Sequence, residues 1–401
     1  MINVGKAKKL VIKNSKPLDA ISINVIESDG YVLAEDLKSK VDLPLFNNSA
    51  MDGFAIKHAD SVDAAIKNPL KLQIIATIKA GDSPKIRLKK GGAVKIMTGG
   101  MIPKGADAVV RKEDCSETSG YLILKQKIPS GQHIRYKGEE IKKGALGLKK
   151  GTAINPAAIG FILELGYKKI KVYRKPKISV LVTGEELLGL DEKLRAGKIR
   201  ETNSYSLSAA ISNQKADLIA VERVKDSFSV IKRKILFLLR QSDILIIAGG
   251  VSVGDYDYIK DILLEIKVKK IFWGVSQRPG GPLYFGVYKN KLIFGLPGNP
   301  ASSLLCFYEY IRPSILKLTG KKEYFLTKID AILSEDLKKK KGKTHFIRGI
   351  VELKNNIYYT SSAGDQGSHI LKSFALCNCF IIFPEENTNL KKGEKVEVHL
   401  L

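Results

Sequence analysis

The sequence predicts a multidomain protein in which a parallel α/β sheet is combined with smaller β domains. Between residues 177 and 273, apolar strands alternate with helices, a pattern typical of parallel sheets covered by helices. Residues 44–139 contain short strands separated by glycines, which indicates a small β-barrel or sandwich, and short strands return after residue 324. The length of 401 residues agrees, because it corresponds to two to four domains of about 150 residues each.

The N-terminal half can be assigned from local patterns. Residues 3–14 are predicted to form a short helix capped by Asn3, and residues 31–42 a strand and a turn. Alternating apolar residues predict strands in the β insertion at 72–78, 93–97, 108–112 and 121–125. Residues 155–165 return to a helical period.

The C-terminal half begins with the continuous apolar strand 177–182. Further sheet strands are predicted at 218–224, 243–248 and 269–273, with helices between them at 204–212, 228–240 and 258–266. Pro300 at the first turn favours a long helix over 299–318. A small all-β domain is predicted from strands at 328–333, 346–353, 380–383 and 395–399.

The chain is strongly basic. Its 67 lysines and arginines exceed its 41 acidic residues by 26. Such an excess can attract a polyanion or form a solvated surface, and the scattered lysines without interleaved aromatic residues favour the second interpretation over nucleic-acid binding. The lysine run 338–341 is interpreted as the tip of a hairpin.

The cysteines and the hydropathy pattern indicate a cytoplasmic protein. The four cysteines do not have the spacing of a disulfide framework or a zinc site, so free thiols in a reducing compartment are expected. The N-terminal residues lack the apolar core of a signal peptide, and no apolar run approaches the ~20 residues of a membrane span.

The strongest local signal is the segment 243–257, DILIIAGGVSVGDYD. A buried strand ends at Gly249 and Gly250, the loop continues through Ser252 and Gly254, and a helix follows. Glycine loops before a helix expose N–H groups to phosphates at the carboxyl ends of parallel strands. The alternative is a structural turn that binds nothing, because the spacing fits no dinucleotide fingerprint.

Several carboxylates are predicted along the same edge. Glu186 follows the first strand of the sheet, Asp226 follows another, and Asp255 and Asp257 flank the glycine loop. Acids beside a phosphate would repel it without a cation, and Mg²⁺ prefers carboxylate and phosphate oxygens. Capping of a helix explains Asp226 and Asp255 equally well, whereas Glu186 and Asp257 are favoured as site residues.

Two further clusters are less specific. The first comprises the turn 277–282 with Arg278, the helix start with Ser302, Arg348 on a strand, and the loop 367–369 with Ser368, and these groups could hold an oxyanion. On its own, Arg348 would be an ordinary surface arginine. The second cluster comprises segments 46–55, 96–100 and 137–141 of the β insertion, where turn formation is a complete explanation.

Together these segments resemble the molybdopterin molybdenumtransferase family, the molybdenum insertases of molybdenum-cofactor synthesis, which includes the C-terminal part of gephyrin. The resemblance spans nearly the whole chain. Ten motifs occur in family order: FNNSAMDGFAI, IMTGGMIPKGADAVV, RYKGEEI, VTGEEL, GKIRETNS, AGGVSVGDYDY, QRPGGP, GLPGNPASS, HFIRG and GDQGSHILKSF.

The resemblance implies an elongated four-domain subunit that acts as a homodimer. The implied domains are a discontinuous N-terminal or linker domain (1–43 and 140–175), the inserted β domain (44–139), the α/β molybdopterin-binding domain (176–322) and a C-terminal β-barrel domain (323–401). The implied reaction inserts molybdenum from molybdate into adenylylated molybdopterin with Mg²⁺ and releases AMP. The implied cleft lies between the sheet domain of one subunit and the β insertion of the other.

The family's functional positions can be transferred residue by residue. Glu186, Asp226 and Asp257 match the sheet-domain acids, and Gly249, Gly250, Ser252 and Gly254 the glycine loop; Asp52, Thr98 and Glu140 match positions of the insertion; Arg278, Ser302, Arg348 and Ser368 match the molybdate pocket. Glu186 and Asp257 are the implied metal ligands. The chain departs from the family at Glu140, usually aspartate, at Arg278, usually lysine, and at Gly281, where many relatives have lysine.

Alternative functions belong to different classes. A molybdopterin adenylyltransferase would share the sheet domain, although that activity needs neither the β insertion nor the C-terminal domain. A non-catalytic scaffold that keeps the fold is the other alternative. Contacts with the adenylylating enzyme and with recipient molybdoenzymes are expected partners of an insertase, and the choice between molybdate and tungstate stays open.

Overall fold

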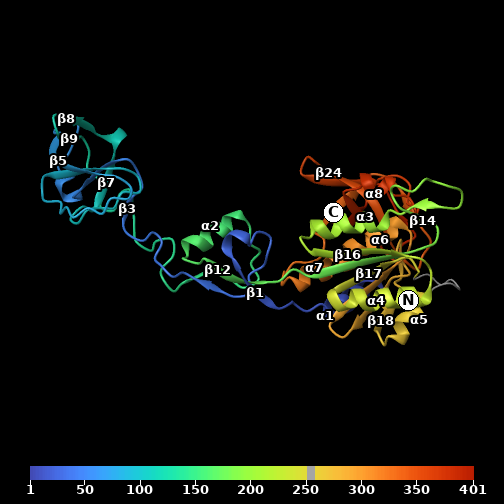
Figure 1. The fold of residues 1–401 in the computed structure, drawn as a ribbon. Coiled ribbons are helices and arrows are strands. Elements are labelled where there is room, and N and C mark those ends of the chain that lie inside the picture. Colours follow the sequence, from blue (N-terminus) through green and yellow to red (C-terminus); the bar gives the residue numbers. More distant parts are fainter. Residues whose placement is uncertain (251–257) are drawn as a thin grey trace.

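The chain folds into an elongated molecule (Figure 1). The computed structural model describes residues 1–250 and 258–401. The β insertion lies at one end, a small middle unit follows, and the α/β sheet with the C-terminal β domain forms the other end. Within the described residues, no helix is long and apolar enough to cross a membrane.

The largest unit is built on a six-stranded sheet. Its strands, in spatial order, are β16 (Asp217–Val224), β13 (Lys177–Thr183), β17 (Ile244–Ala248), β21 (Lys291–Leu296), β20 (Tyr284–Tyr288) and β18 (Lys269–Trp273). The first four strands are parallel, as the sequence predicts. The predicted strand β18 runs in the same direction, but the reversed strand β20 lies between it and β21, so β18 pairs antiparallel with β20.

Helices cover both faces of this sheet. They are α1 (Val4–Asn14), α3 (Asn203–Asn213), α4 (Phe228–Gln241), α5 (Tyr258–Glu265), α6 (Pro300–Cys306) and α7 (Arg312–Leu318). Alternate residues of β17 enter two different cores: Ile244 and Ile246 pack with α1, α3, α6 and α7, whereas Leu245 and Ile247 pack with α4 and α5. Burial on both faces explains why the strands are continuously apolar.

The predicted helix 299–318 is present with one irregularity. A π-helical turn, η4 (Phe307–Ile311), separates α6 from α7. Pro313 follows directly and lacks the N–H that a regular α-helix would donate, so the widened turn accommodates it.

The N-terminal helix packs on the sheet. Asn3 caps α1 by accepting a hydrogen bond from the Lys6 N–H at 2.7 Å, as expected. Ala7 and Val11 are fully buried in the core that also contains Ile311 and Ile315. This packing joins α1 to the sheet unit, away from the rest of segment 1–43.

The chain passes between the middle unit and the β insertion twice, once near Leu43 and once near Ile141. The middle unit contains β1 (Ala20–Asn24), η1 (Val25–Glu27), β2 (Leu37–Lys38), β11 (Leu146–Leu148), α2 (Pro156–Glu164) and β12 (Lys169–Tyr173). The insertion contains β3 (Asn48–Ser49), β4 (Gly53–Ile56), η2 (His58–Ser61), β5 (Leu70–Ile78), β6 (Gly92–Ile96), β7 (Ala108–Arg111), η3 (Lys112–Asp114), β8 (Ser116–Thr118), β9 (Tyr121–Leu124) and β10 (Ile134–Arg135). An antiparallel bridge between Leu43 and Ile141 marks the boundary.

The C-terminal unit is a closed five-stranded β-barrel. Its strands are β22 (Lys328–Leu333), β24 (Thr344–Lys354), β25 (Ile357–Ser362), β26 (Cys379–Phe383) and β28 (Lys395–Leu400), with α8 (Lys372–Leu376) at one side. The pairing of β24 with β26 closes the ring. The multidomain α/β plus β fold class is therefore confirmed.

The lysine run does not form a hairpin tip. The preceding strand β23 (Leu337–Lys338) pairs with β27 (Asn389–Leu390) and not with β24. Residues 339–343 therefore form a loop that leads into β24. At the start of β24, Thr344 and His345 pair with β19 (Gln277–Arg278), so the loop reaches the sheet unit.

Candidate active site

A cavity of about 560 Å³ lies at the carboxyl edge of the parallel strands. Its wall is made where β13, β17 and β21 end, at Thr183, Gly249 and Gly298. Gly249 has a φ of 93°, and a Cβ atom there would lie 2.5 Å from the Thr183 carbonyl oxygen. Only glycine permits this close approach of two loops, so the sequence prediction of a tight glycine turn has a structural basis.

Two of the predicted acids line this cavity. Glu186 and Asp226 both contribute to its wall, as do Gly249 and Gly250. The Asp226 carboxylate accepts a hydrogen bond from the Thr183 hydroxyl, which ties the ends of β16 and β13 together. Ser252, Gly254, Asp255 and Asp257 lie outside the described residues. Among the remaining residues, no group of three or more histidine, cysteine or acidic side chains is arranged as a metal site.

Four cavity residues were missed by sequence reasoning. They are Arg200, Asn203, Asn299 and His369. The Asn203 amide donates to the Gly298 carbonyl oxygen at 2.7 Å, and Arg200 donates to the carbonyl oxygens of Leu190 and Glu192 at 2.8 Å each. The motifs GKIRETNS and GLPGNPASS contain three of these residues, but only the folded loops show that they face one cavity.

Arg348 is a buried cation on β24, and it contacts the loop that leads to the cavity residue His369. Its side chain is 1% exposed, and no carboxylate pairs with it within the described residues. Its Nε donates to the Ser373 hydroxyl at 2.9 Å, and Nη2 donates to the carbonyl oxygens of Asp365 and Gly367 at 3.1 Å each. Within the same residues, Nη1 has no hydrogen-bond partner. Burial lowers the pKa of Arg348.

An unpartnered buried guanidinium nitrogen is a sign of a missing anion. A buried polar group without a partner costs stability, and a charged group costs more. The adjacent loop carries Ser368, which is partly exposed, and His369, which lines the sheet-edge cavity. Arg348 is therefore a buried arginine with an uncommitted nitrogen, and not the ordinary surface arginine that the sequence alone favours.

Arg278 and Ser302 approach from the sheet unit. Ser302 is 2% exposed near the start of α6. A Cβ atom on Gly280 would lie 2.7 Å from the Cys306 Sγ atom and 3.4 Å from the Ser302 carbonyl oxygen, so the 277–282 turn packs directly on α6. Arg278 lines a second pocket together with Gln366 and Gly367 of the Arg348 loop. The structure thus places Arg278 beside the loop that contacts Arg348, at the junction of the sheet unit and the barrel.

The cluster in the β insertion is only partly assembled. Asp52 accepts hydrogen bonds from the Thr98 backbone N–H at 2.7 Å and from its hydroxyl at 2.9 Å. These two donors lower the pKa of Asp52. Glu140 is exposed at the boundary with the middle unit, where its N–H donates to the Leu43 carbonyl oxygen at 3.0 Å. In one chain this cluster lies at the opposite end of the molecule from the sheet-edge cavity (Figure 1).

The fold and the site define a class of protein: a four-unit chain whose parallel sheet carries a glycine-lined cavity at its carboxyl edge and whose barrel contains a buried arginine. Three family models match in order. They are described as "MoeA N-terminal region (domain I and II)" at residues 2–166, "Probable molybdopterin binding domain" at 179–317, and "MoeA C-terminal region (domain IV)" at 330–401.

Full-length relatives agree with these matches. The chain is 32% identical to molybdopterin molybdenumtransferase of Haemophilus influenzae, with 100% of both chains covered, and 35% identical to that of Staphylococcus epidermidis, with 100% of this chain and 95% of the relative covered. A crystal structure of the molybdopterin biosynthesis moeA protein from Pyrococcus horikoshii superposes with a TM-score of 0.86 at 30% identity over 100% of both chains. The chain belongs to the molybdopterin molybdenumtransferase (MoeA) family.

Proposed function

We propose that this protein inserts molybdenum from molybdate into adenylylated molybdopterin and releases AMP, which completes the molybdenum cofactor. The observation that carries the proposal is similarity over the whole length to proteins named for this activity. A lone adenylyltransferase would need only the sheet unit, whereas all four units are matched here.

The sheet-edge cavity and the surroundings of Arg348 suit two different parts of the reaction. The sheet-edge cavity, with Gly249, Gly250 and Asn299, would bind the nucleotide part of the pterin. Arg348, together with Ser368, Arg278 and Ser302, would hold the tetrahedral oxyanion at the junction with the barrel. Rigid placement of two anionic reactants side by side would supply most of the rate, without a protein nucleophile.

Glu186 and Asp226 fit a role as Mg²⁺ ligands. Both carboxylates line the cavity in which the phosphates would lie, and Mg²⁺ is held by one or two carboxylates plus phosphate oxygens. When bound there, Mg²⁺ would neutralise negative charge on the phosphates of the leaving group. Asp257 is a further predicted ligand outside the described residues.

The direct test combines purified protein with adenylylated molybdopterin, molybdate and Mg²⁺. AMP release and the formation of active cofactor are expected together. A parallel reaction with ATP and unadenylylated molybdopterin distinguishes the adenylyltransferase alternative. Absence of AMP release and of active cofactor in the first reaction rejects the proposal. Tungstate in place of molybdate determines the metal preference.

We further propose a homodimer in which Asp52 and Thr98 of one subunit complete the sheet-edge cavity of the other. A complementation experiment tests this arrangement. Asp52→Ala and Asp226→Ala chains, each inactive alone, are unfolded, mixed and refolded. Half of the dimers are then hybrids with one intact site, so about a quarter of the wild-type activity should return. No recovered activity, with dimers present by light scattering, rejects the shared site.

The proposed setting is the cytoplasm, because all four cysteines are free thiols in the structure. Contacts with the adenylylating enzyme and with recipient molybdoenzymes are proposed from the reaction itself. The pterin substrate and the finished cofactor are carried between the three kinds of protein.

A further inference from the structure

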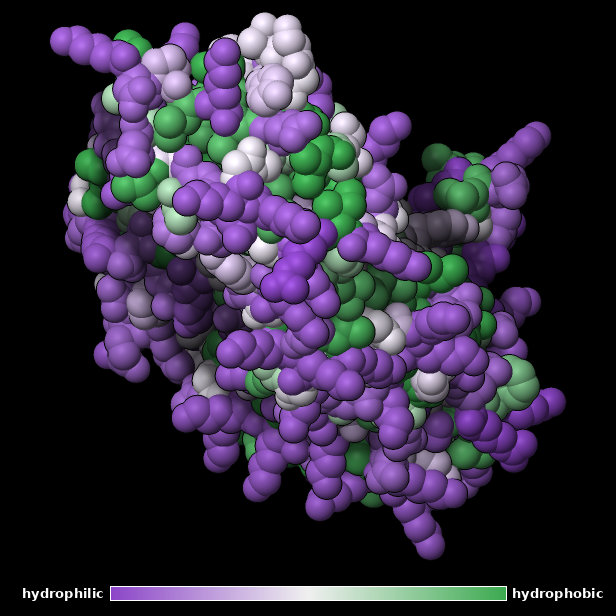
Figure 2. Space-filling view, turned by 90° about the vertical axis from the view of Figure 1, so that its left-hand side faces the viewer, coloured by the Kyte–Doolittle hydropathy of each residue, from purple (hydrophilic) through white to green (hydrophobic). Residues whose placement is uncertain are grey.

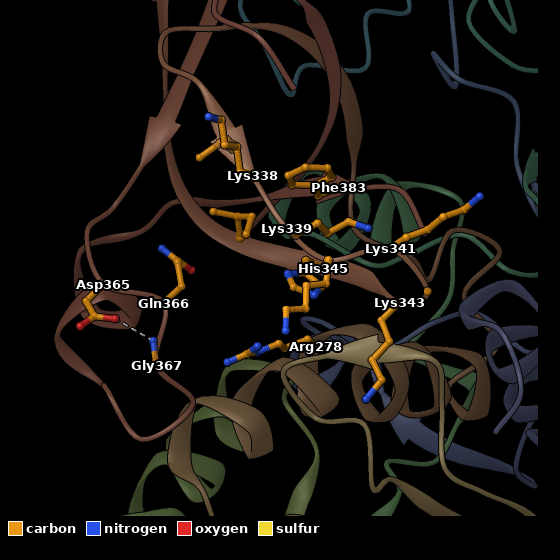
Figure 3. A pocket seen from close by; sticks show the side chains of 14 residues that line it. Arg278, Lys338, Lys339, Lys341, Lys343, His345, Asp365, Gln366, Gly367 and Phe383 are labelled. Carbon is orange, nitrogen blue, oxygen red and sulfur yellow. Dashed lines mark hydrogen bonds between the residues drawn. The ribbon is translucent and has the colours of Figure 1, made fainter. Parts of the chain in front are cut away.

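A second pocket lies between the lysine loop (residues 339–343) and the Arg348 loop (residues 365–367), which accepts hydrogen bonds from Arg348. Its volume is about 720 Å³, and it is formed by residues 337–343, 365–367, Arg278 and three residues of the barrel wall. We call this space the lysine pocket. None of its lining residues lines the sheet-edge cavity. Figure 3 shows Arg278 and His345 near its centre, between the lysines and the 365–367 loop.

The charge of the lysine pocket is almost entirely positive. Six cationic side chains line it, and Asp365 is the one acid in its wall. The cationic residues are Arg278, Lys338, Lys339, Lys340, Lys341 and Lys343. The Asp365 carboxylate accepts a hydrogen bond from the Gly367 N–H at 3.0 Å, which holds it in the loop.

Nearby acids neutralise little of this charge. Lys341 forms an exposed ion pair with Glu386 at 3.1 Å, and Lys339 Nζ donates to the Glu385 carbonyl oxygen at 3.2 Å. The Glu385 carboxylate accepts from the Ser276 hydroxyl at 3.0 Å. The other four cations have no acidic partner within 4 Å among residues 1–250 and 258–401; they are Arg278, Lys338, Lys340 and Lys343.

The effect of these cations is visible at His345. This half-buried ring lies in the pocket wall, 6.4 Å from the Phe383 ring between centroids. Burial and, to a smaller extent, the positive charges of Lys339, Arg278 and Lys343 together lower the pKa of His345 to about 4. The ring is therefore neutral at physiological pH, so it adds no charge but can accept or donate a hydrogen bond.

We propose that the lysine pocket binds a small polyanion with two or more linked phosphate groups. The volume lies in the range of small-molecule sites, roughly 300–1,000 Å³, and exceeds what one tetrahedral anion needs. Four cations without acidic partners can neutralise several phosphate charges at once. A nucleic-acid groove would instead need exposed aromatic side chains for stacking, and Phe383 is fully buried.

The proposal goes beyond the insertase reaction, because the site is separate from the sheet-edge cavity. Inorganic diphosphate and the phosphate chain of a nucleotide share the required chemistry. Either ligand would also contact Arg278, which belongs to the proposed oxyanion site as well. Occupation of the lysine pocket would therefore affect how Arg278 meets the oxyanion.

Calorimetric titration of the full chain tests the proposal without any pterin. The probes are pyrophosphate, ATP and single phosphate. Pyrophosphate or ATP should bind at least about tenfold more tightly than phosphate. Tighter pyrophosphate binding identifies an inorganic ligand, and tighter ATP binding a nucleotide. If neither pyrophosphate nor ATP binds more tightly than phosphate, the proposal is overturned.

Two matched variants locate the binding. Lys340→Gln/Lys343→Gln removes two exposed pocket cations and should weaken pyrophosphate binding by about tenfold. Lys89→Gln/Lys90→Gln removes the same charge from an exposed loop of the β insertion and should leave binding unchanged. Equal weakening in both variants, or none in the first, overturns the proposal. Because AMP release is not measured, this result is independent of the insertase proposal.

Discussion

Arg348 and the lysine loop present positive charge to the same 365–367 segment in opposite ways. Arg348 is 1% exposed, with three of its N–H groups committed to fixed acceptors, whereas Lys340, Lys341 and Lys343 are exposed on a loop. A fixed, desolvated cation selects the position and shape of an anion, whereas exposed lysines act through long-range attraction and are screened by salt. Arg348 therefore suits selection of an anion by its shape, whereas the exposed lysines suit its long-range attraction. Figure 2 shows hydrophilic side chains spread over much of the face in view, as a lysine-rich surface requires.

The buried and paired carboxylate of Glu309 is the reference for this comparison. Its removal should have the largest effect on the free energy of unfolding. Glu309 is 2% exposed, forms an ion pair with Lys8 and lies 2.8 Å from His399 Nδ1, so it joins α1, the π turn and the barrel. The pKa of Glu309 is lowered: burial opposes this shift, but the contacts with His399 and Lys8 outweigh it.

Glu309→Ala should lower the free energy of unfolding by about 3–5 kcal/mol, because Lys8 and the buried His399 ring both lose the carboxylate that they contact. Urea unfolding measures the change. Glu352→Ala, which removes an exposed pair with Lys354, should change it by less than about 0.5 kcal/mol. Similar values for both variants would show that the buried network contributes no more than a surface pair.

Arg348→Lys should lower the rate of AMP release by about a hundredfold. The charge is kept, but one ammonium cannot reach Ser373, both loop carbonyl oxygens and an anion together. The assay is AMP release at fixed molybdate, with circular dichroism to show that the variant is folded. A rate equal to that of the wild type would mean that charge alone is sufficient at this position.

The pH dependence of stability should report the field of the lysine pocket. The pKa of His345 is about 4 in the folded protein, whereas its ordinary value of 6.5 applies to the unfolded chain. As the pH falls, the histidine is therefore protonated in the unfolded chain before it is protonated in the folded protein. Stability should therefore decrease between pH 6.5 and 4, by roughly 2–3 kcal/mol from this residue. Urea unfolding of the wild type and His345→Gln at several pH values measures the difference.

A direct observation of the same ring sharpens this prediction. The histidine signals in an NMR titration give the pKa of His345 in the wild type and in Lys343→Gln. Removal of one of the charges that lower the pKa should raise it toward 6.5. An unchanged pKa would show that the Lys343 charge does not contribute to the shift.

The smallest effect is expected from a single exposed lysine. Lys340→Gln should raise the free energy of unfolding by a few tenths of a kcal/mol at low salt, because repulsion within the loop decreases. In about 1 M salt the difference should disappear. Thermal unfolding at the two salt concentrations measures both values. A difference that persists in salt would indicate a local contact of Lys340.

Regular elements of the sheet unit could be predicted because their patterns are local. The apolar run 243–248 and the helix 228–240 correspond closely to β17 and α4. The reversed strand β20 between β21 and β18 could not be predicted, since it depends on the β20–β21 hairpin, and the π turn depends on how Pro313 is accommodated.

The residues of the candidate site also divide into those that local patterns predict and those that only the folded structure brings together. Glu186, Asp226 and Gly249 follow sheet strands, and the rule that parallel strands end at one edge placed them together. Arg200 lies on the two-residue strand β15 (Ile199–Arg200), Asn203 begins α3 and His369 lies on a loop, and no periodic pattern predicts that these three meet at one cavity. The unpartnered Nη1 of Arg348 depends on loop carbonyl oxygens and on Ser373, which are distant in sequence.

The boundary of the β insertion has a consequence for limited proteolysis. The chain crosses it twice, and the Leu43 N–H donates to the Ile141 carbonyl oxygen at 2.8 Å where the two crossings pair. One nick there leaves the insertion tethered by the uncut crossing, so a single cleavage does not release it as a fragment. Separation of the two ends of the molecule requires a second cut, and a nicked sample would still migrate as one particle under native conditions.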